Sequence, residues 1–258
     1  MYKAYKDLRR SLGMYHVWLY QAYYNISSKY KRTFLGSLWI SLSYVLYTFG
    51  MATLWGALFG RNLHDVLPYV MFGYLIAQFV FWILNDAPEI FISNSGIIRN
   101  HAYPANYYVL EGGARAFMTL LHNLPIALVA TAIVGASAVP DWTIIIGLPV
   151  VILTVLTWGM VIAMASSRFR DLRFLLPQIG AMLMFMTPVY WRRDMLHSHY
   201  WIADVNPFAA LISLIREPLL GRPPSNIEWS VALGYSIVGI IFYMIVFPAF
   251  RKRIPFWV

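Results

Sequence analysis

The chain has 258 residues, of which 60% are hydrophobic and 12% are charged, and it contains no cysteine. A charged share this far below the roughly one quarter typical of soluble domains argues against a soluble protein. The missing cysteines exclude a disulfide framework and a thiolate metal site. The net charge of +9 would suit a nucleic-acid-binding protein. The basic residues are instead distributed as a membrane-topology signal, so we expect no nucleic-acid partner.

Six long apolar stretches fill most of the chain. Each is about as long as the roughly 20 residues that an α-helix needs to cross a hydrocarbon core. Backbone amides inside lipid must be paired within their own segment, so these stretches predict helices. They are Leu38–Gly56, Leu67–Leu84, Ala116–Val139, Ile144–Ala165, Phe174–Trp191 and Trp229–Phe250. The sequence therefore predicts an all-α membrane protein whose residues 34–258 form one domain of six transmembrane helices.

The distribution of lysine and arginine predicts the orientation of these helices. If both termini are cytoplasmic, only five of the twenty basic residues fall on the outer side, namely Arg61, Arg192, Arg193, Arg216 and Arg222. The opposite orientation would violate the positive-inside rule. We therefore expect a multi-pass protein with both termini in the cytoplasm.

Residues 1–33 show helical periodicity but lack the apolar core and cleavage site of a signal peptide. A basic amphipathic helix of this kind lies in the membrane interface. A soluble helix packed on a partner protein would show the same pattern. We expect an interfacial helix over residues 1–33, in contact with membrane lipids, with an apolar face made of Tyr5, Leu8, Leu12, Tyr15, Leu19, Tyr23 and Ile26.

Two of the connecting segments are long. Asn85–Arg115 is a long cytoplasmic connection between the second and third spans. Arg192–Glu228, on the outer side, is too polar to span a bilayer and too apolar for a free loop. Proline residues before and within it, and the Gly221 and Pro223-Pro224 stop, predict that it is divided into short helices.

Catalytic and nucleotide-binding motifs are missing from the sequence. It has no G-x-x-x-x-G-K-[ST] phosphate loop, and no H-E-x-x-H or G-x-S-x-G motif. Asp86 and Glu89 could form the proton site of a secondary carrier, although such residues more often mark a helix leaving the bilayer. A membrane-embedded enzyme of lipid or glycan metabolism would need clustered carboxylates or histidines, and these are scattered here. Both classes remain open as alternatives.

Four groups of segments, in order along the chain, together resemble one family of membrane proteins. They are Tyr30–Trp39, Ser93–Pro104, the run Ser167–Arg173 followed by Leu176-Pro177 and Thr187–Val189, and Trp201–Arg216. The chain resembles the ABC-2 type permeases that export polysaccharides such as O-antigen and capsule. The match covers nearly the whole chain. It departs at the tail, Arg251–Val258, which is short and basic where the family often ends in a longer acidic stretch.

The resemblance implies a transport subunit of the bacterial inner membrane and not an enzyme. It implies a homodimer of this chain that exports a lipid-linked glycan, together with two ATP-binding cassette subunits that bind ATP and Mg²⁺. This chain itself would then hold no cofactor and no metal. It also implies short re-entrant helices on the outer side between the fifth and sixth spans. Teichoic acid and small lipophilic compounds remain alternative substrates.

The resemblance further implies that two cytoplasmic segments contact the ATPase subunits. The charged connector after the fourth span is compact, and topology alone explains the sign of its charges but not their spacing around Asp171. The expected coupling residues are Asn94, Ile97, Arg99 and His101 in the first segment, and Arg168, Arg170, Asp171 and Arg173 in the second.

Aromatic residues make up 17% of the chain, and many of them fall near predicted span ends, where they would be interface anchors. Ring faces also stack on sugars with little directional demand, which suits a glycan that must keep moving. We expect Tyr44, Tyr47 and Phe185 in the middle of a substrate path, and Tyr190, Trp191 and Trp201 near its outer gate. For any one of these rings, contact with lipid or packing between helices is an equally good interpretation.

Overall fold

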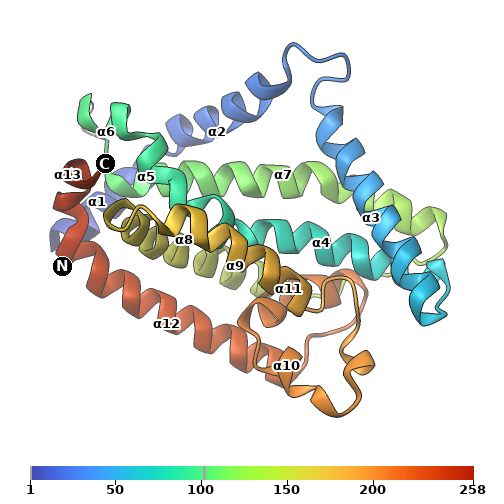
Figure 1. Cartoon of the computed structure of the whole chain (residues 1–258). Helices are drawn as coiled ribbons and strands as arrows, with labels where there is room; N and C mark the ends of the chain where they lie inside the picture. The colour runs from blue at the N-terminus through green and yellow to red at the C-terminus, as the bar shows by residue number, and fades with distance from the viewer. Residues whose placement is uncertain (1, 101–102) are drawn as a thin grey trace.

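The computed structural model describes residues 2–100 and 103–258, which form helices and no strand (Figure 1). The predicted all-α fold is therefore confirmed. The longer helices are α1 (Tyr2–Gly13), α2 (Tyr15–Tyr30), α3 (Leu38–Phe59), α4 (Leu63–Asn85), α7 (Ala105–Ile133), α8 (Ile144–Arg168), α9 (Leu172–Met186), α11 (Pro207–Leu219) and α12 (Asn226–Phe250). The shorter ones are η1 (Ala87–Glu89), α5 (Ile90–Ser93), α6 (Ser95–Asn100), η2 (Arg193–His199), α10 (Trp201–Asp204), η3 (Arg251–Arg253) and α13 (Ile254–Trp257).

Within the described part of the chain, five helical segments are long and apolar enough to cross a membrane. They contain α3, α4, α7, α8 and α12. The predicted fifth span, Phe174–Trp191, is helical only as far as Met186, so α9 has 15 residues. The helix stops there because Pro188 disfavours the helical conformation for the residue before it, and Thr187 is extended with ψ 140°.

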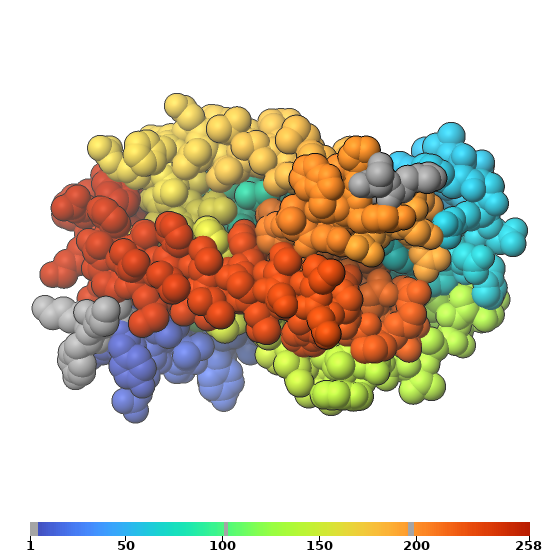
Figure 2. All heavy atoms as spheres, turned by 90° about the horizontal axis from the view of Figure 1, so that it is seen from below, coloured from blue at the N-terminus to red at the C-terminus, as the bar shows by residue number. Residues whose placement is uncertain are grey.

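The central helix of the bundle is α4, which contacts α3, α7, α8, α9 and α11. This helix is surrounded by protein, and 89% of its most apolar 18 residues are buried. Its sequence therefore has no polar stripe. Gly159 of α8 allows a close approach to α4, since a Cβ at that position would stand 2.5 Å from the Trp82 ring. In the space-filling view, α12 lies across the face between α8 and α1 (Figure 2). Its outer side exposes apolar residues, including Leu233, Ile237, Ile241 and Ile245.

The single helix predicted over residues 1–33 is two helices, α1 and α2, separated at Met14. Leu12, Tyr15 and Tyr23 of the predicted apolar face are exposed. The side that packs on the protein is a different one, and it includes Ser11 and Ala22, both fully buried.

The described part of the segment Asn85–Arg115, predicted as a long connection, is largely helical, and all of it except α6 contributes buried residues. It forms η1, α5, α6 and the first part of α7, with Ala87, Pro88 and Phe91 buried. Composition did not reveal this helical packing, because the helices before α7 are short. The burial of η1 and α5 depends on their contacts with α8.

One end of the bundle gathers four basic segments and both ends of the chain, whereas the C-terminal end of α2 lies away from it (Figure 1). We call it the basic end and define it as residues 2–13, 95–100, 168–173 and 251–258. The turn between α3 and α4, together with α10 and α11, lies at the opposite end. The fold thus gathers most of the basic residues that the sequence pattern placed on one side, but Lys29, Lys31, Arg32 and Arg115 lie outside these segments.

Candidate functional site

Five rings from α3, α4 and the region around the end of α9 form one contiguous group, the aromatic cluster: Tyr44, Tyr47, Tyr74, Phe185 and Tyr190. The ring centroids of Tyr47 and Tyr74 lie 4.4 Å apart, and Tyr190 lies 6.2 Å from each of them. The hydroxyl oxygens of Tyr47 and Tyr190 are 2.9 Å apart, within hydrogen-bonding distance. The structure therefore brings four of the six predicted path residues together and adds Tyr74.

The members of the cluster differ in exposure. Tyr44 and Tyr190 are buried, and the Tyr44 hydroxyl donates to the Met71 carbonyl at 2.9 Å. Tyr47 and Phe185 are 38% and 60% exposed. The cluster thus has a fixed inner layer and presents ring surface at the outside of this chain.

The two predicted gate tryptophans are placed apart from each other. Trp191 is 9% exposed, and its indole N–H donates to the Phe185 carbonyl at 2.9 Å, so it belongs beside the cluster. Trp201 is 61% exposed at the start of α10. Nothing in the described structure connects Trp201 directly to the cluster rings.

Sequence reasoning missed Arg216, the most buried cation among the described side chains, at 3% exposure in α11. Its guanidinium donates to the Pro188 carbonyl and to the Ser213 hydroxyl, and it lies 4.0 Å from the centroid of the Tyr69 ring. It also pairs with Glu217 at 3.1 Å. Arg216 therefore ties α11 to the extended backbone after α9. Its signal in the sequence was a single arginine inside the apolar run of residues 207–220.

The first predicted coupling segment forms α6 and the turn before it. The Asn94 amide donates to the Ile90 carbonyl at 2.8 Å, and Ile97 is 45% exposed. The Arg99 guanidinium donates to the Val258 carbonyl, with its Nε at 3.1 Å. His101 lies outside the described residues.

The second predicted coupling segment connects α8 and α9. Arg168 is exposed, with its guanidinium 5.8 Å from the Phe169 ring centroid. Arg170 donates to the Trp257 carbonyl at 3.2 Å, and Asp171 is the residue before α9. Arg173 lies 3.9 Å from the Glu89 carboxylate.

Both predicted coupling segments meet the tail, because Arg99 donates to the main-chain oxygen of Val258 and Arg170 to that of Trp257. The tail also reaches α1, where Arg251 pairs with Asp7 at 2.9 Å. Burial raises the pKa of the Asp7 carboxyl, and the Arg251 guanidinium opposes that shift only in part. The basic end is thus one connected surface, which the sequence alone did not indicate.

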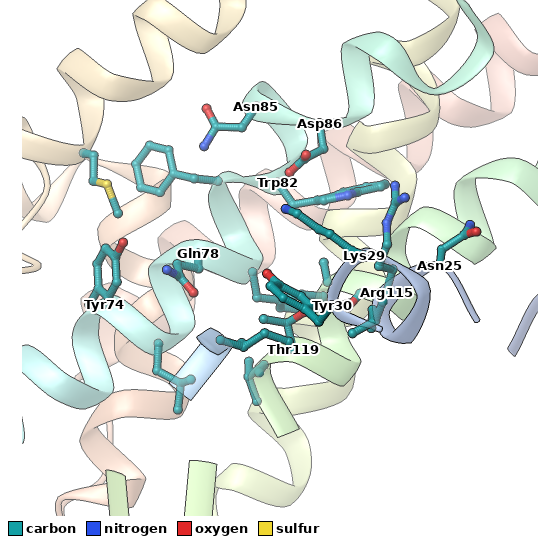
Figure 3. A pocket seen from close by; sticks show the side chains of 18 residues that line it. Asn25, Lys29, Tyr30, Tyr74, Gln78, Trp82, Asn85, Asp86, Arg115 and Thr119 are labelled. Carbon is teal, nitrogen blue, oxygen red and sulfur yellow. Dashed lines mark hydrogen bonds between the residues drawn. The ribbon is translucent and has the colours of Figure 1, made fainter. Parts of the chain in front are cut away.

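A cavity of about 550 Å³ opens between α2, α3, α4, α7 and α9 (Figure 3). Tyr74, Gln78, Trp82 and Asp86 of α4 and its C-cap line one side, at the spacing of four that places residues on one helix face. The other polar lining residues are Asn25, Lys29, Tyr30, Asn85, Arg115 and Thr119. Tyr74 belongs both to this cavity and to the aromatic cluster.

The family model of the ABC-2 type transporter matches residues 16–220 of the chain. The chain belongs to the ABC-2 type transporter family. This membership and the five apolar helices make it a multi-pass membrane protein. It is a transport subunit of the kind that works with separate ATP-binding subunits. No curated protein sequence matches it.

Family membership confirms the resemblance seen in the sequence at the level of the ABC-2 type transporter. The matched range contains the aromatic cluster, the cavity and both predicted coupling segments, and it ends after α11. The helix α12 and the tail that contacts the two predicted coupling segments lie beyond the match.

Proposed function

We propose that this ABC-2 transporter is the permease subunit of an exporter that moves a lipid-linked polysaccharide, of O-antigen or capsule type, across the bacterial inner membrane. ATP hydrolysis in two separate subunits, which bind the ATP and Mg²⁺, drives the export. The observation that supports a glycan substrate is the aromatic cluster. Its stacked rings offer broad faces with little directional demand, as a sliding sugar chain requires.

We propose that two copies of the chain enclose the path. Tyr47 and Phe185 are exposed in a single chain, and they stand beside exposed apolar residues of α3 and α9 such as Phe49 and Met182. A second copy facing these helices would cover the apolar surface and close the ring-lined side.

We propose that α9 is the fifth of six spans and that α10 and α11 are re-entrant. A helix of 15 residues is about 22 Å long, shorter than a hydrocarbon core of about 30 Å. The extended residues after it would complete the crossing. Non-helical backbone at that depth needs protein cover, and α11 supplies part of it, since Arg216 donates to the Pro188 carbonyl.

We propose that the basic end faces the cytoplasm and contacts the ATPase subunits through α6 and the α8–α9 connection. The positive-inside rule favours this orientation, which places both termini in the cytoplasm. The exposed apolar faces of α1 and α2 would then lie in the cytoplasmic membrane interface, in contact with lipid.

The proposed path is tested by replacing Tyr47 and Phe185 together by alanine in cells that depend on this chain for surface glycan. Each ring stack is worth about 1 kcal/mol, so losing two exposed faces should lower surface glycan by roughly tenfold or more. The matched control is Leu233→Ala with Ile237→Ala, which removes exposed apolar side chains of α12, outside both the cluster and the proposed interface between copies. Protein level and ATP hydrolysis should be unchanged in both. Normal surface glycan in the Tyr47 and Phe185 variant would contradict the proposed path.

A further inference from the structure

The tail of the chain is held between the two predicted coupling segments. The guanidinium of Arg99, in α6, donates to the main-chain oxygen of Val258. The guanidinium of Arg170, in the α8–α9 connection, donates to the main-chain oxygen of Trp257. The helix of the tail, α13, lies beside α6 at the basic end (Figure 1). The tail therefore joins two segments that are about 70 residues apart in the sequence.

One large side chain of the tail is exposed although the residues around it are anchored. At the start of the tail, Arg251 pairs with Asp7 of α1 at 2.9 Å, and Ile254 and Val258 are buried. The Phe256 ring between them is 87% exposed. The ring thus contributes little to packing within this chain, while its backbone is fixed in place. An apolar side chain that is positioned in advance loses little conformational entropy when it binds.

The lengths of two helices place this ring outside the hydrocarbon core of the bilayer. The neighbouring helices α8 and α12 have 25 residues each, so each is about 37 Å long, whereas the hydrocarbon core is about 30 Å thick. Trp142 precedes α8 and Trp229 lies in the first turn of α12, as aromatic anchors do at a membrane interface.

With these tryptophans at one edge of the core, both helices end roughly 7 Å beyond the other edge. A tilt of about 20° would shorten this overhang by only about 2 Å. Phe256 follows α12 along the chain, and so lipid tails do not cover it.

We propose that the tail is a third docking element for the ATP-binding subunit and that Phe256 enters an apolar pocket of that subunit. A subunit that contacts both coupling segments also meets the tail, because the tail is hydrogen-bonded to both. A second copy of this chain is a poor occupant. Two copies in one membrane have their basic ends on the same side, so the exposed Lys252 and Arg253 would face like charges.

This inference rests on the proposed function for the place of the coupling segments. It goes beyond that function because the match to the family ends at residue 220, before the tail begins.

The first test measures how tightly the ATP-binding subunit that copurifies with this chain binds the full chain in phosphatidylcholine nanodiscs. Phe256→Ala should weaken binding by about tenfold or more, the usual effect of truncating an aromatic hot spot. Phe256→Leu keeps an apolar side chain and should weaken binding less. The matched control is Phe34→Ala, because Phe34 is also exposed but lies in the turn between α2 and α3. Neither exposed ring should affect the unfolding of the chain.

The second test identifies what covers the tail with a single fluorescent label, which is possible because the chain contains no cysteine. A bimane label on Arg253→Cys, three residues before Phe256, should shift its emission to shorter wavelength when the ATP-binding subunit is added. Dibrominated lipid should not quench it. The same label on Ile97→Cys reports on α6, where Ile97 is exposed.

The inference is overturned if Phe256→Ala binds the subunit as tightly as the unchanged chain, or if the label at residue 253 is silent while that at residue 97 responds. Quenching at residue 253 by the lipid would identify the membrane as the occupant. A label shielded before the subunit is added, but not quenched by the lipid, would identify a second copy. Either result also overturns the inference. Silence at both positions with binding retained would overturn the proposed coupling segments as well, so the two failures are distinguishable.

Discussion

Replacing Arg216 by methionine should destabilise the protein, because Arg216 connects α11 to the backbone that follows α9. The variant keeps an unbranched apolar stem but removes the donors to Pro188 and Ser213 and the stacking on Tyr69. It also leaves Glu217, whose side chain is only 15% exposed, with Arg222 as its remaining cation at 2.8 Å.

The size of the effect follows from these contacts. Removing one member of a buried ion pair costs roughly 3–5 kcal/mol, mainly because the partner charge stays buried. Since Arg222 still neutralises Glu217, we expect a value near the lower limit, about 3 kcal/mol. Arg216→Lys keeps the charge but loses the planar fork, so it should cost about 1 kcal/mol. Arg222 is 49% exposed, so Arg222→Gln should cost less than about 1 kcal/mol.

Reversible unfolding in mixed micelles containing sodium dodecyl sulfate would measure these free energies. We expect Arg222→Gln to lose the least stability, Arg216→Lys to lose more, and Arg216→Met to lose the most. Limited proteolysis should also cut the Arg216→Met variant near α11 sooner than the wild type. Equal stability of Arg216→Met and the wild type, or a larger loss for Arg222→Gln, would refute the reasoning.

Three further outcomes are expected. Gly147→Ala should lower the free energy of unfolding by about 2 kcal/mol, because the added Cβ would stand 2.4 Å from the Leu214 carbonyl oxygen. Gly50→Ala, where nothing lies within 4 Å of the added Cβ, should be neutral or stabilising in the same unfolding assay. Thr154→Val should cost about 1 kcal/mol by removing the α8–α12 hydrogen bond to Ser236, and Ser236→Ala should add little to it in a double-mutant cycle. Replacing Arg168 and Arg170 by glutamine and Asp171 by asparagine should leave membrane insertion intact. In the complex with its ATPase, this variant should hydrolyse ATP without exporting substrate. Normal export per ATP hydrolysed would remove these residues from the proposed interface.

The sequence alone determined the class of the protein and most of the separation of its charges. Long apolar runs can be satisfied in lipid only as helices, so the pattern fixed the positions of α3, α4, α7, α8 and α12 to within a few residues at most ends. The start of α7 at Ala105, well before the predicted Ala116, was missed because residues 105–115 mix polar residues and two glycines with apolar ones and so have no continuous apolar signature. The gathering of basic segments at one end likewise followed from their positions along the chain.

Only the tertiary structure decided what the polar and aromatic residues do. The hydroxyls of Tyr47 and Tyr190 are 143 residues apart in sequence and 2.9 Å apart in space, a contact that no local pattern specifies. The cavity is assembled from five helices, so Lys29 and Arg115 become neighbours only when α2 packs along α7. Arg216 looked like an outer-loop charge in the sequence but is buried, because burial depends on what the other helices place around it. Helix formation in a membrane is a local requirement, whereas a binding surface is a property of packing between distant segments.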